Sequence, residues 1–231
     1  MKKVILSSVL VLYMTGVFAQ KFTWDEREFE AINSKAEIVT MDGAQVLKVE
    51  RDLNTFPFDE KNIDASVDGP TYVKLTNAAM ENGTIEVKML SRIMEDSPFP
   101  AARGFIGVAY RIDQENRNFD AIYLRPSNGR ADDQLRRNHT VQYFSYPGYT
   151  FSRLRKEADG LYETYADIGL NEWIDVRIEL QGGKAVLYIN NQKSPSFIVA
   201  KMLGTSKKGS IGLWVDIGTI GYFKDLKVIQ K

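Results

Sequence analysis

The sequence contains no cysteine and only one histidine, His139. Without cysteine there is no disulfide framework, no thiolate metal site and no lipid attached through a thiol. One histidine and no cysteine also exclude a zinc site of the usual ligand types. They leave little room for a Ser–His–Asp triad. Such a chain depends on its hydrophobic core for stability, and 231 residues are enough to bury a large one.

The sequence has no excess of charge of either sign, since 30 Lys and Arg residues balance 30 Asp and Glu residues. Nucleic-acid binding needs a basic surface, so no nucleic-acid partner is expected. Locally the balance differs, because 125–156 holds seven Lys and Arg residues against two acids, Asp132 and Asp133. A positive field of this size in a neutral protein fits a small anionic group better than a polyanion.

Long apolar runs are missing except at the N-terminus. Lys2 and Lys3 precede an apolar run over 4–12, and 17–19 ends on Ala19, a small residue typical of signal-peptidase cleavage. The run is shorter than the ~20 apolar residues that span a bilayer, which argues against a membrane anchor. The sequence therefore predicts a cleaved signal peptide over 1–19, a single domain over 20–231, and a secreted or periplasmic protein without stable membrane insertion.

Alternating apolar and polar residues dominate the rest of the chain and predict β-strands. The clearest example is 174–180, where Ile174, Val176 and Ile178 alternate with charged residues. A glycine hairpin over 181–184 follows it. Further strands are expected over 45–49, 71–75, 83–89, 104–112, 119–125, 185–189, 210–216 and 222–229. Helical signal is thin, with one short helix expected over 23–32 from a possible capping box. The pattern predicts an all-β fold.

Two runs near the C-terminus carry a family resemblance. They read EWIDVRIELQGGKAVLYINNQ and GSIGLWVDIGTIGYFKDLKVIQ, and NGTIEVKM lies earlier in the chain. Together they resemble the concanavalin A-like lectin/glucanase superfamily, the laminin-G-like group included, over about 36–229. The resemblance implies an antiparallel two-sheet jelly-roll sandwich with few short helices. It does not decide function, because the group contains lectins, glycoside hydrolases, polysaccharide lyases and adhesion modules.

Function is expected in 122–149, the most polar part of the chain. Tyr123 and Arg125 alternate with apolar residues and are expected on the open face of a strand, where a ring stacks on sugar and a guanidinium binds hydroxyls or a carboxylate. A loop over 126–138 and a second strand from 139 follow. The expected ligand-binding residues are Tyr123, Arg125, Asn128, Arg130, Arg137, Gln142 and Tyr146. Within the loop, Arg130 and Arg137 bind an acidic sugar or pair internally with Asp132 and Asp133. These two acids are also weak Ca²⁺ candidates; otherwise no cofactor is expected.

Catalysis is the alternative to binding. His139 and Tyr143 lie two residues apart and are expected to point the same way. With Glu163 they are the candidate catalytic residues. Arg or Gln, His and Tyr together suit β-elimination of uronic-acid glycans. Hydrolysis needs paired carboxylates; no glucanase-type run of acids occurs, although two of Asp120, Glu163 and Asp167 can converge in space. A protein that binds a glycan or oligosaccharide is the leading hypothesis, with an acidic or oxidised sugar as one candidate ligand, ahead of a hydrolase, a lyase and an adhesion module.

Overall fold

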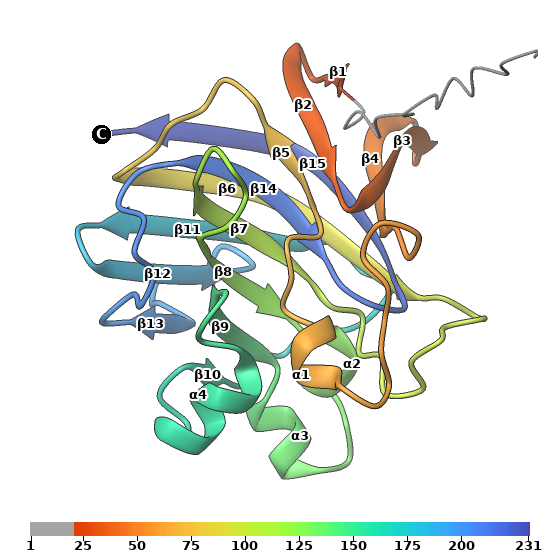
Figure 1. The fold of residues 1–231 in the computed structure, drawn as a ribbon, viewed down its shortest axis with the longest axis vertical. Helices are drawn as coiled ribbons and strands as arrows, with labels where there is room; N and C mark the ends of the chain where they lie inside the picture. The colour runs from red at the N-terminus through yellow and green to blue at the C-terminus, as the bar shows by residue number, and fades with distance from the viewer. Residues whose placement is uncertain (1–20) are drawn as a thin grey trace, which may run out of the picture.

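The computed structural model describes residues 21–231, so the predicted signal peptide over 1–19 lies outside the described residues. Within these residues, fifteen strands form two antiparallel sheets (Figure 1). The eight-stranded sheet has the order β1 (Lys21–Trp24), β2 (Arg27–Ile32), β5 (Tyr72–Leu75), β14 (Ser210–Val215), β7 (Ile106–Ile112), β8 (Phe119–Leu124), β9 (Val141–Tyr146), β10 (Glu163–Thr164). The seven-stranded sheet has the order β13 (Phe197–Val199), β12 (Lys184–Ile189), β11 (Ile174–Gln181), β6 (Gly83–Ile93), β15 (Thr219–Gln230), β4 (Ala44–Arg51), β3 (Ser34–Met41).

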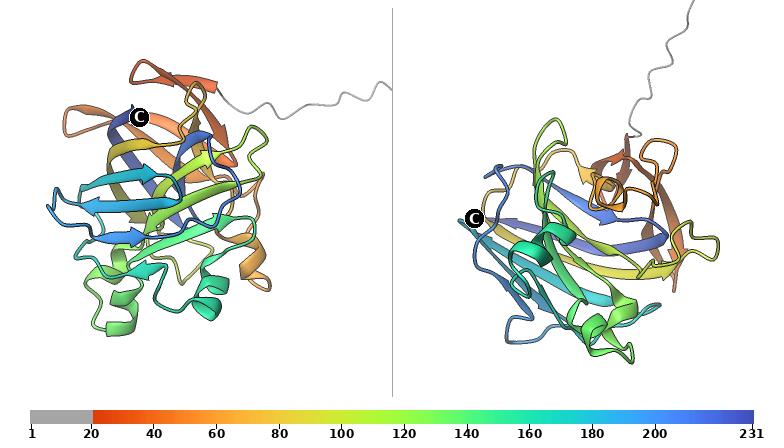
Figure 2. Two further views of the ribbon diagram at one scale, coloured as in Figure 1. Left: turned by 90° about the vertical axis from the view of Figure 1, so that its left-hand side faces the viewer. Right: turned by 60° about the horizontal axis from the view of Figure 1, so that its bottom comes forward.

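Four short helices gather at one end of the sandwich, at the bottom of Figure 1 and of the left view in Figure 2. They are α1 (Ile63–Ser66), α2 (Pro126–Gly129), α3 (Gln134–Asn138) and α4 (Phe151–Glu157). Within residues 21–231, none of the helices has the length and apolar character needed to cross a membrane. The predicted antiparallel two-sheet sandwich with few short helices is confirmed.

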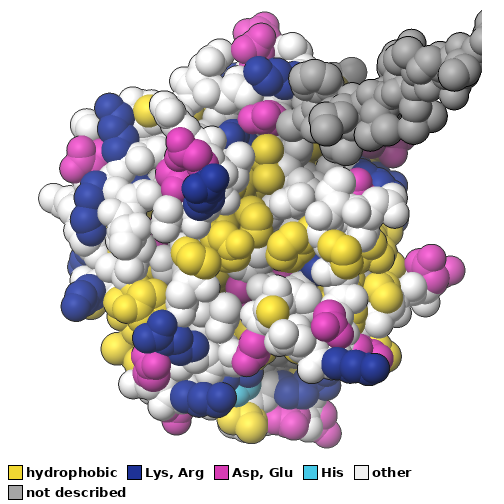
Figure 3. Space-filling model, in the orientation of Figure 1, with side chains coloured by type: hydrophobic (Ala, Val, Ile, Leu, Met, Phe, Trp, Pro, Cys, Tyr) yellow, Lys and Arg dark blue, Asp and Glu magenta, His cyan; other side chains and the backbone are white. Residues whose placement is uncertain are grey.

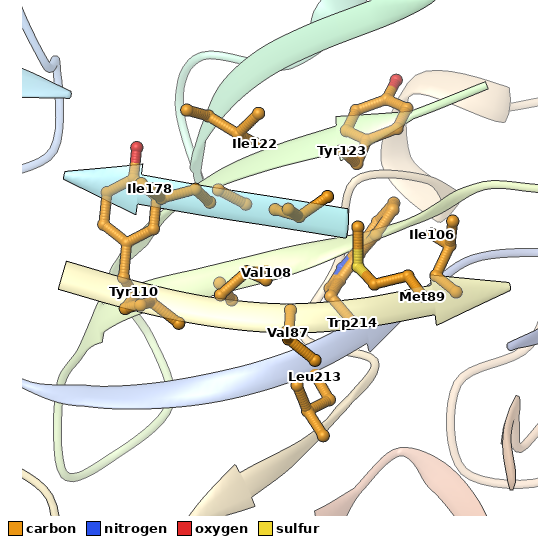
Figure 4. Close-up of a cluster of buried hydrophobic side chains, with 14 of the residues drawn as sticks. Val87, Met89, Ile106, Val108, Tyr110, Ile122, Tyr123, Ile178, Leu213 and Trp214 are labelled. Atoms are coloured by element: carbon orange, nitrogen blue, oxygen red, sulfur yellow. The ribbon is translucent and has the colours of Figure 1, made fainter. Parts of the chain in front are cut away.

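The alternation predicted over 174–180 is visible in the burial of β11. Ile174, Val176 and Ile178 are buried, and the charged residues between them are half-exposed on the outer face of the seven-stranded sheet. The buried residues pack against side chains of the eight-stranded sheet in one continuous core. Figure 4 shows part of this core, with Val87 from one sheet and Val108 from the other.

The helix predicted over 23–32 is wrong. This segment is a β-hairpin, in which β1 pairs with β2 through the turn residues Asp25 and Glu26. Both turn residues have positive φ, 49° and 58°, which is the backbone of a type I′ hairpin turn. Trp24 and Phe29 are buried and pack with ring centroids 5.6 Å apart, so the aromatic pair stabilises the hairpin relative to the predicted helix.

Strands β7, β8 and β9 differ from ordinary sandwich strands because nearly every residue in them is buried on both faces. One face forms the inter-sheet core. The other is covered by the segment 52–71, the segment 94–105 and α4. Two contacts fix this cover: the indole Nε1 of Trp214 donates to the carbonyl of Gly69, and the backbone N–H of Phe151 donates to Asp68. The cover creates a cavity between loops and sheet.

Candidate functional site

A cavity of about 260 Å³ lies between this cover and the eight-stranded sheet. Strand alternation puts its floor, Tyr123 and Arg125, on the face of β8 opposite to Ile122, away from the inter-sheet core. Figure 3 shows Lys and Arg side chains on both sides of the histidine, below a band of hydrophobic side chains. The lining comprises Ile63, Val67, Asp68, Phe99, Ala101, Arg103, Phe105, Tyr123, Arg125, Asn128, Arg136, His139, Phe151, Arg155 and Asp216.

Tyr123 and Arg125 form the floor because β8 passes directly beneath the cavity. The Arg125 guanidinium is 4% exposed; it donates to the Tyr123 hydroxyl, to the backbone carbonyl of His139 at 3.1 Å and to Oε1 of Gln142 at 3.4 Å. The Tyr123 ring packs on Trp214 with centroids 4.9 Å apart. The structure therefore brings Tyr123, Arg125 and Gln142 together as predicted. The expectation that they stand on an open sheet face is wrong, because the cover buries that face.

Arg103 and Arg136 stand beside Arg125 with few partners. Within residues 21–231, no carboxylate comes within 4 Å of any of these three guanidinium groups. Arg103 donates only to the backbone carbonyl of Ala102, and Arg136 reaches Oδ1 of Asn128 at 3.4 Å. Burial, together with the charges of Arg136 and Arg125, lowers the pKa of Arg103. The cavity therefore concentrates positive charge that the described protein does not neutralise.

His139 forms one wall together with Glu163 and Arg155. Nδ1 of His139 lies 2.7 Å from Oε2 of Glu163, and Nε of Arg155 donates to the same oxygen at 3.0 Å. Within the described residues Nε2 of His139 makes no hydrogen bond, so it is the nitrogen available to a ligand. Burial and the nearby Arg155 charge lower the pKa of His139, while Glu163 opposes the shift. The net shift favours the neutral imidazole.

Two buried acids complete the cavity, and neither was predicted. Asp216 binds Nη1 of Arg51 at 2.7 Å and also accepts the backbone N–H groups of Asp68 and Ile217. Burial raises the pKa of Asp216. Burial, with a contribution from Asp216, raises the pKa of Asp68 to about 7. Sequence reasoning missed both because Asp68 precedes Gly69 in what looks like an ordinary turn, and Asp216 is the last residue of the expected strand 210–216.

Tyr143 and Tyr146 do not belong to this site. Tyr143 pairs with Ile122, so it faces the side of β9 opposite to Gln142. Its hydroxyl donates to Oδ1 of Asp120 at 2.5 Å. The expectation that Tyr143 and His139 point the same way is wrong. Strand β9 begins only at Val141, and His139 caps the C-terminus of α3, so the two residues do not share a strand. Tyr146 stacks on Phe119 at 5.2 Å, at the far end of β9.

The loop predicted over 126–138 is folded into α2 and α3, and its side chains divide between cavity and surface. Asn128 lines the cavity and donates to the backbone carbonyl of His139 at 3.3 Å. Arg130 is instead paired with Asp167 and Glu172 at 2.8 and 2.9 Å. Of the two alternatives for this residue, sugar binding and internal pairing, the structure shows internal pairing, but with these acids and not with Asp132 and Asp133.

The other charged residues of this segment also point outward. Arg137 stacks on Tyr165 and donates to its hydroxyl at 2.8 Å, so Arg136, not Arg137, faces the cavity. Asp133 caps α3 by accepting the backbone N–H of Arg136, and Asp132 is exposed. Within residues 21–231, no group of three or more His, Asp or Glu side chains is arranged to hold a metal ion.

A second, larger cavity of about 690 Å³ lies over the outer face of the seven-stranded sheet. Its charged side chains pair with one another: Lys88 with Asp175 at 3.7 Å and with Asp225 at 3.5 Å, and Lys227 with Glu86 at 3.8 Å. The charges on this solvent-exposed face of the sheet therefore neutralise one another. The covered cavity is therefore the stronger candidate site.

No family model matches the chain, and neither does any curated protein sequence. Among solved structures, the carbohydrate-binding module CBM66 from Bacillus subtilis is similar at 13% identity, with a TM-score of 0.52 over 87% of this chain and 97% of that one. A Bacillus licheniformis β-glucanase is similar at 10% identity over 96% of this chain and 90% of that one, with a TM-score of 0.41. The likeness to the binding module shows a shared fold, in agreement with the predicted jelly roll.

Proposed function

We propose that the protein binds a carbohydrate, and specifically an acidic sugar, in the covered cavity. The observation that carries this proposal is the group of three guanidiniums, Arg103, Arg125 and Arg136, which face the cavity without a carboxylate partner in the described chain. Guanidinium groups bind carboxylates through two parallel hydrogen bonds. A sugar carboxylate in the cavity supplies the negatively charged partner that these three guanidinium groups lack within the described residues.

The shape of the cavity supports a single sugar unit. About 260 Å³ lies just below the ~300–1,000 Å³ typical of pockets for larger ligands. Phe99, Phe105 and Phe151 line it and offer apolar faces to the C–H side of a sugar ring, while the arginines and Asn128 offer donors. A monosaccharide, free or at the end of a chain, matches this mixture better than an extended polysaccharide.

Calorimetry with D-glucuronate, D-galacturonate and their neutral parents tests the proposal. Both uronates should bind, and both neutral sugars should bind at least about tenfold more weakly, because a hydrogen bond to a charged group is worth about 1.5–3 kcal/mol. Arg136→Gln should weaken uronate binding by a similar factor. Arg153→Gln is the matched control, because Arg153 lies on the cavity-forming helix α4 but pairs outward with Glu157. Equal binding of neutral and acidic sugars, or no binding at all, would contradict the proposal.

A second candidate function is β-elimination from a 4-O-linked uronate. It is favoured by His139, a neutral imidazole oriented by Glu163 and placed beside a carboxylate-binding arginine cluster. In this reaction Nε2 of His139 removes the C5 proton, the electron pair forms the C4=C5 double bond, and the C4–O bond breaks. The leaving oxygen then takes up a proton. Hydrolysis by paired carboxylates is less well supported, because Asp216 is already held by Arg51.

Ultraviolet absorbance of the unsaturated product measures the elimination on oligouronates. Activity should appear with the unmodified protein and disappear in His139→Gln, while uronate binding by that variant persists. Activity that survives His139→Gln would remove this residue from the chemistry. If uronates bind without turnover, the binding function stands alone. If no glycan binds, the adhesion-module hypothesis remains.

The location of the protein is part of the same proposal. A secreted or periplasmic protein meets polysaccharides outside the cytoplasm, and the N-terminal sequence motivates this location. The mass of the mature protein from its native host tests it. Cleavage after Ala19 is the expected result, and an uncleaved chain in the cytoplasm would contradict it.

A further inference from the structure

Asp68 is the most deeply placed charged group that touches the cavity. Its side chain is 2% exposed. Its Oδ2 atom accepts the backbone N–H of Phe151 at 2.7 Å, which fixes the carboxyl group against α4. Within residues 21–231 no protein donor reaches Oδ1. The segment that carries it holds Asp68 in a left-handed backbone conformation, with φ of 54°. One carboxyl oxygen is therefore bound by the protein, and the other is left to the cavity.

Charged groups from three parts of the chain surround this carboxyl. Asp216 approaches from the turn after β14 and disfavours the ionised form of Asp68, whereas Arg125 from the end of β8 and Arg155 from α4 favour it. The Tyr123 hydroxyl lies on the floor beside them. Burial is the main cause that raises the pKa of Asp68 to about 7, and these neighbouring charges modify it.

The remaining charged groups of the cavity stand farther out or are paired. Arg103 and Arg136 lie on the loop and helix at the rim, and His139 and Glu163 pair on the wall. Arg51 pairs with Asp216, whose charge it balances, and donates its other hydrogen bonds to backbone carbonyls of the segment 52–71. None of these groups supplies a second hydrogen-bond partner for Asp68.

We propose that Asp68 binds the acidic sugar in its protonated form, so that ligand and proton enter the cavity together. The inference rests on the proposed binding function. An incoming carboxylate repels an ionised Asp68. It also draws the charge of Arg125 and Arg155 to itself and so removes the support for ionisation. The protonated acid instead offers its hydrogen from Oδ1, the oxygen without a partner, as a donor to the ligand.

The coupling between protonation of Asp68 and sugar binding predicts a measurable pH dependence of the Kd. In the free protein the Asp68 carboxyl has a pKa of about 7. If only the protonated form binds, the Kd for an acidic sugar should rise about tenfold from pH 6 to pH 8, because the protonated fraction falls by about that factor. At pH 8 binding should take up most of one proton. Proton uptake is opposite to the release expected if a ligand hydroxyl bound the ionised carboxylate.

Calorimetry with D-glucuronate at pH 7.5, in phosphate and in Tris, measures the proton count, because the two buffers differ in ionisation enthalpy. The unmodified protein should show buffer-dependent enthalpies corresponding to an uptake of roughly half a proton or more. Asp68→Asn should show equal enthalpies in both buffers, a Kd that is constant from pH 6 to pH 8, and about tenfold tighter binding than the unmodified protein at pH 8. Asn tolerates the left-handed backbone and keeps the acceptor for the Phe151 N–H.

A matched control identifies the titrating group. Asp64→Asn removes an exposed acid of α1 that does not line the cavity, and proton uptake should persist in this variant. Binding of glucuronate without proton uptake would overturn the inference and leave the proposed function intact. Weaker binding by Asp68→Asn than by the unmodified protein at pH 8, where the carboxyl of the free protein is mostly ionised, would show that the ionised carboxylate is required, which overturns it as well. Absence of glucuronate binding at both pH values would overturn both proposals.

Discussion

Replacing Asp68 with asparagine should make the stability of the protein less dependent on pH. In the folded protein the pKa of Asp68 is raised from 3.8 to about 7, mainly by burial. Between these two values the folded state binds more protons at this site than the unfolded state does. The free energy of unfolding therefore falls as the pH rises from about 4 to about 7. Asparagine has no proton to lose and should abolish this contribution.

The magnitude follows from the shift. A difference of about three pKa units costs the folded state about 4 kcal/mol at pH 8, where the carboxyl is ionised in both states. At pH 5 the folded group is still protonated and the cost is only about 1.5 kcal/mol. From pH 5 to pH 8 the unmodified protein should therefore lose about 2.5 kcal/mol more stability than Asp68→Asn.

Urea unfolding followed by tryptophan fluorescence at pH 5 and pH 8 measures this difference. Asp64→Asn is the matched control: Asp64 is an exposed acid four residues earlier, in α1, so the substitution makes the same change of charge without removing a buried carboxyl. It should leave the pH dependence of the unmodified protein unchanged. An identical pH dependence in Asp68→Asn would refute the reasoning, because burial would then not hold this carboxyl in its neutral form.

Three further perturbations test the frame around the cavity. Arg51→Met should lower the free energy of unfolding by about 3–5 kcal/mol in urea titrations, because it leaves Asp216 buried without its ion-pair partner; a loss below about 1 kcal/mol would contradict this. Gly107→Ala should cost at least about 2 kcal/mol in the same assay, since a Cβ atom there would lie 2.4 Å from a backbone oxygen of β8, and an unchanged midpoint would count against the strand register. Glu163→Gln should lower the pKa of His139, followed by NMR of the imidazole, because it removes the carboxylate that favours the charged ring; a raised or constant value would argue against their pairing.

The cavity depends on burial of a sheet face that is usually open. Its floor is rigid, since Tyr123 packs on Trp214 and Arg125 holds three separate acceptors. Its walls come from loops and a short helix, which are tied to the floor through Asp68 and Trp214. Positive charge is thus held in place before any ligand arrives, and this lowers the cost of ordering side chains on binding.

The strands and the region of the site could be predicted from local patterns. Alternation in β11 and β8 assigns each residue to a face, because successive side chains in a strand point in opposite directions. That rule correctly placed Tyr123 and Arg125 on the face away from the core. The local excess of arginine in 125–156 also predicts an anionic ligand, and Arg125, Arg136 and Arg155 all line the cavity.

Only the tertiary structure decided which charged groups remain free. Arg130 and Arg136 look alike in the sequence, yet Arg130 pairs with acids 37 and 42 residues away, and Arg136 faces the cavity. Asp68 and Asp216 lie 148 positions apart and meet in a site that no local pattern marks. Periodicity fixes the direction of a side chain relative to its own strand. Its neighbours, its burial and therefore its charge depend on segments distant in the chain, which only the folded arrangement brings together.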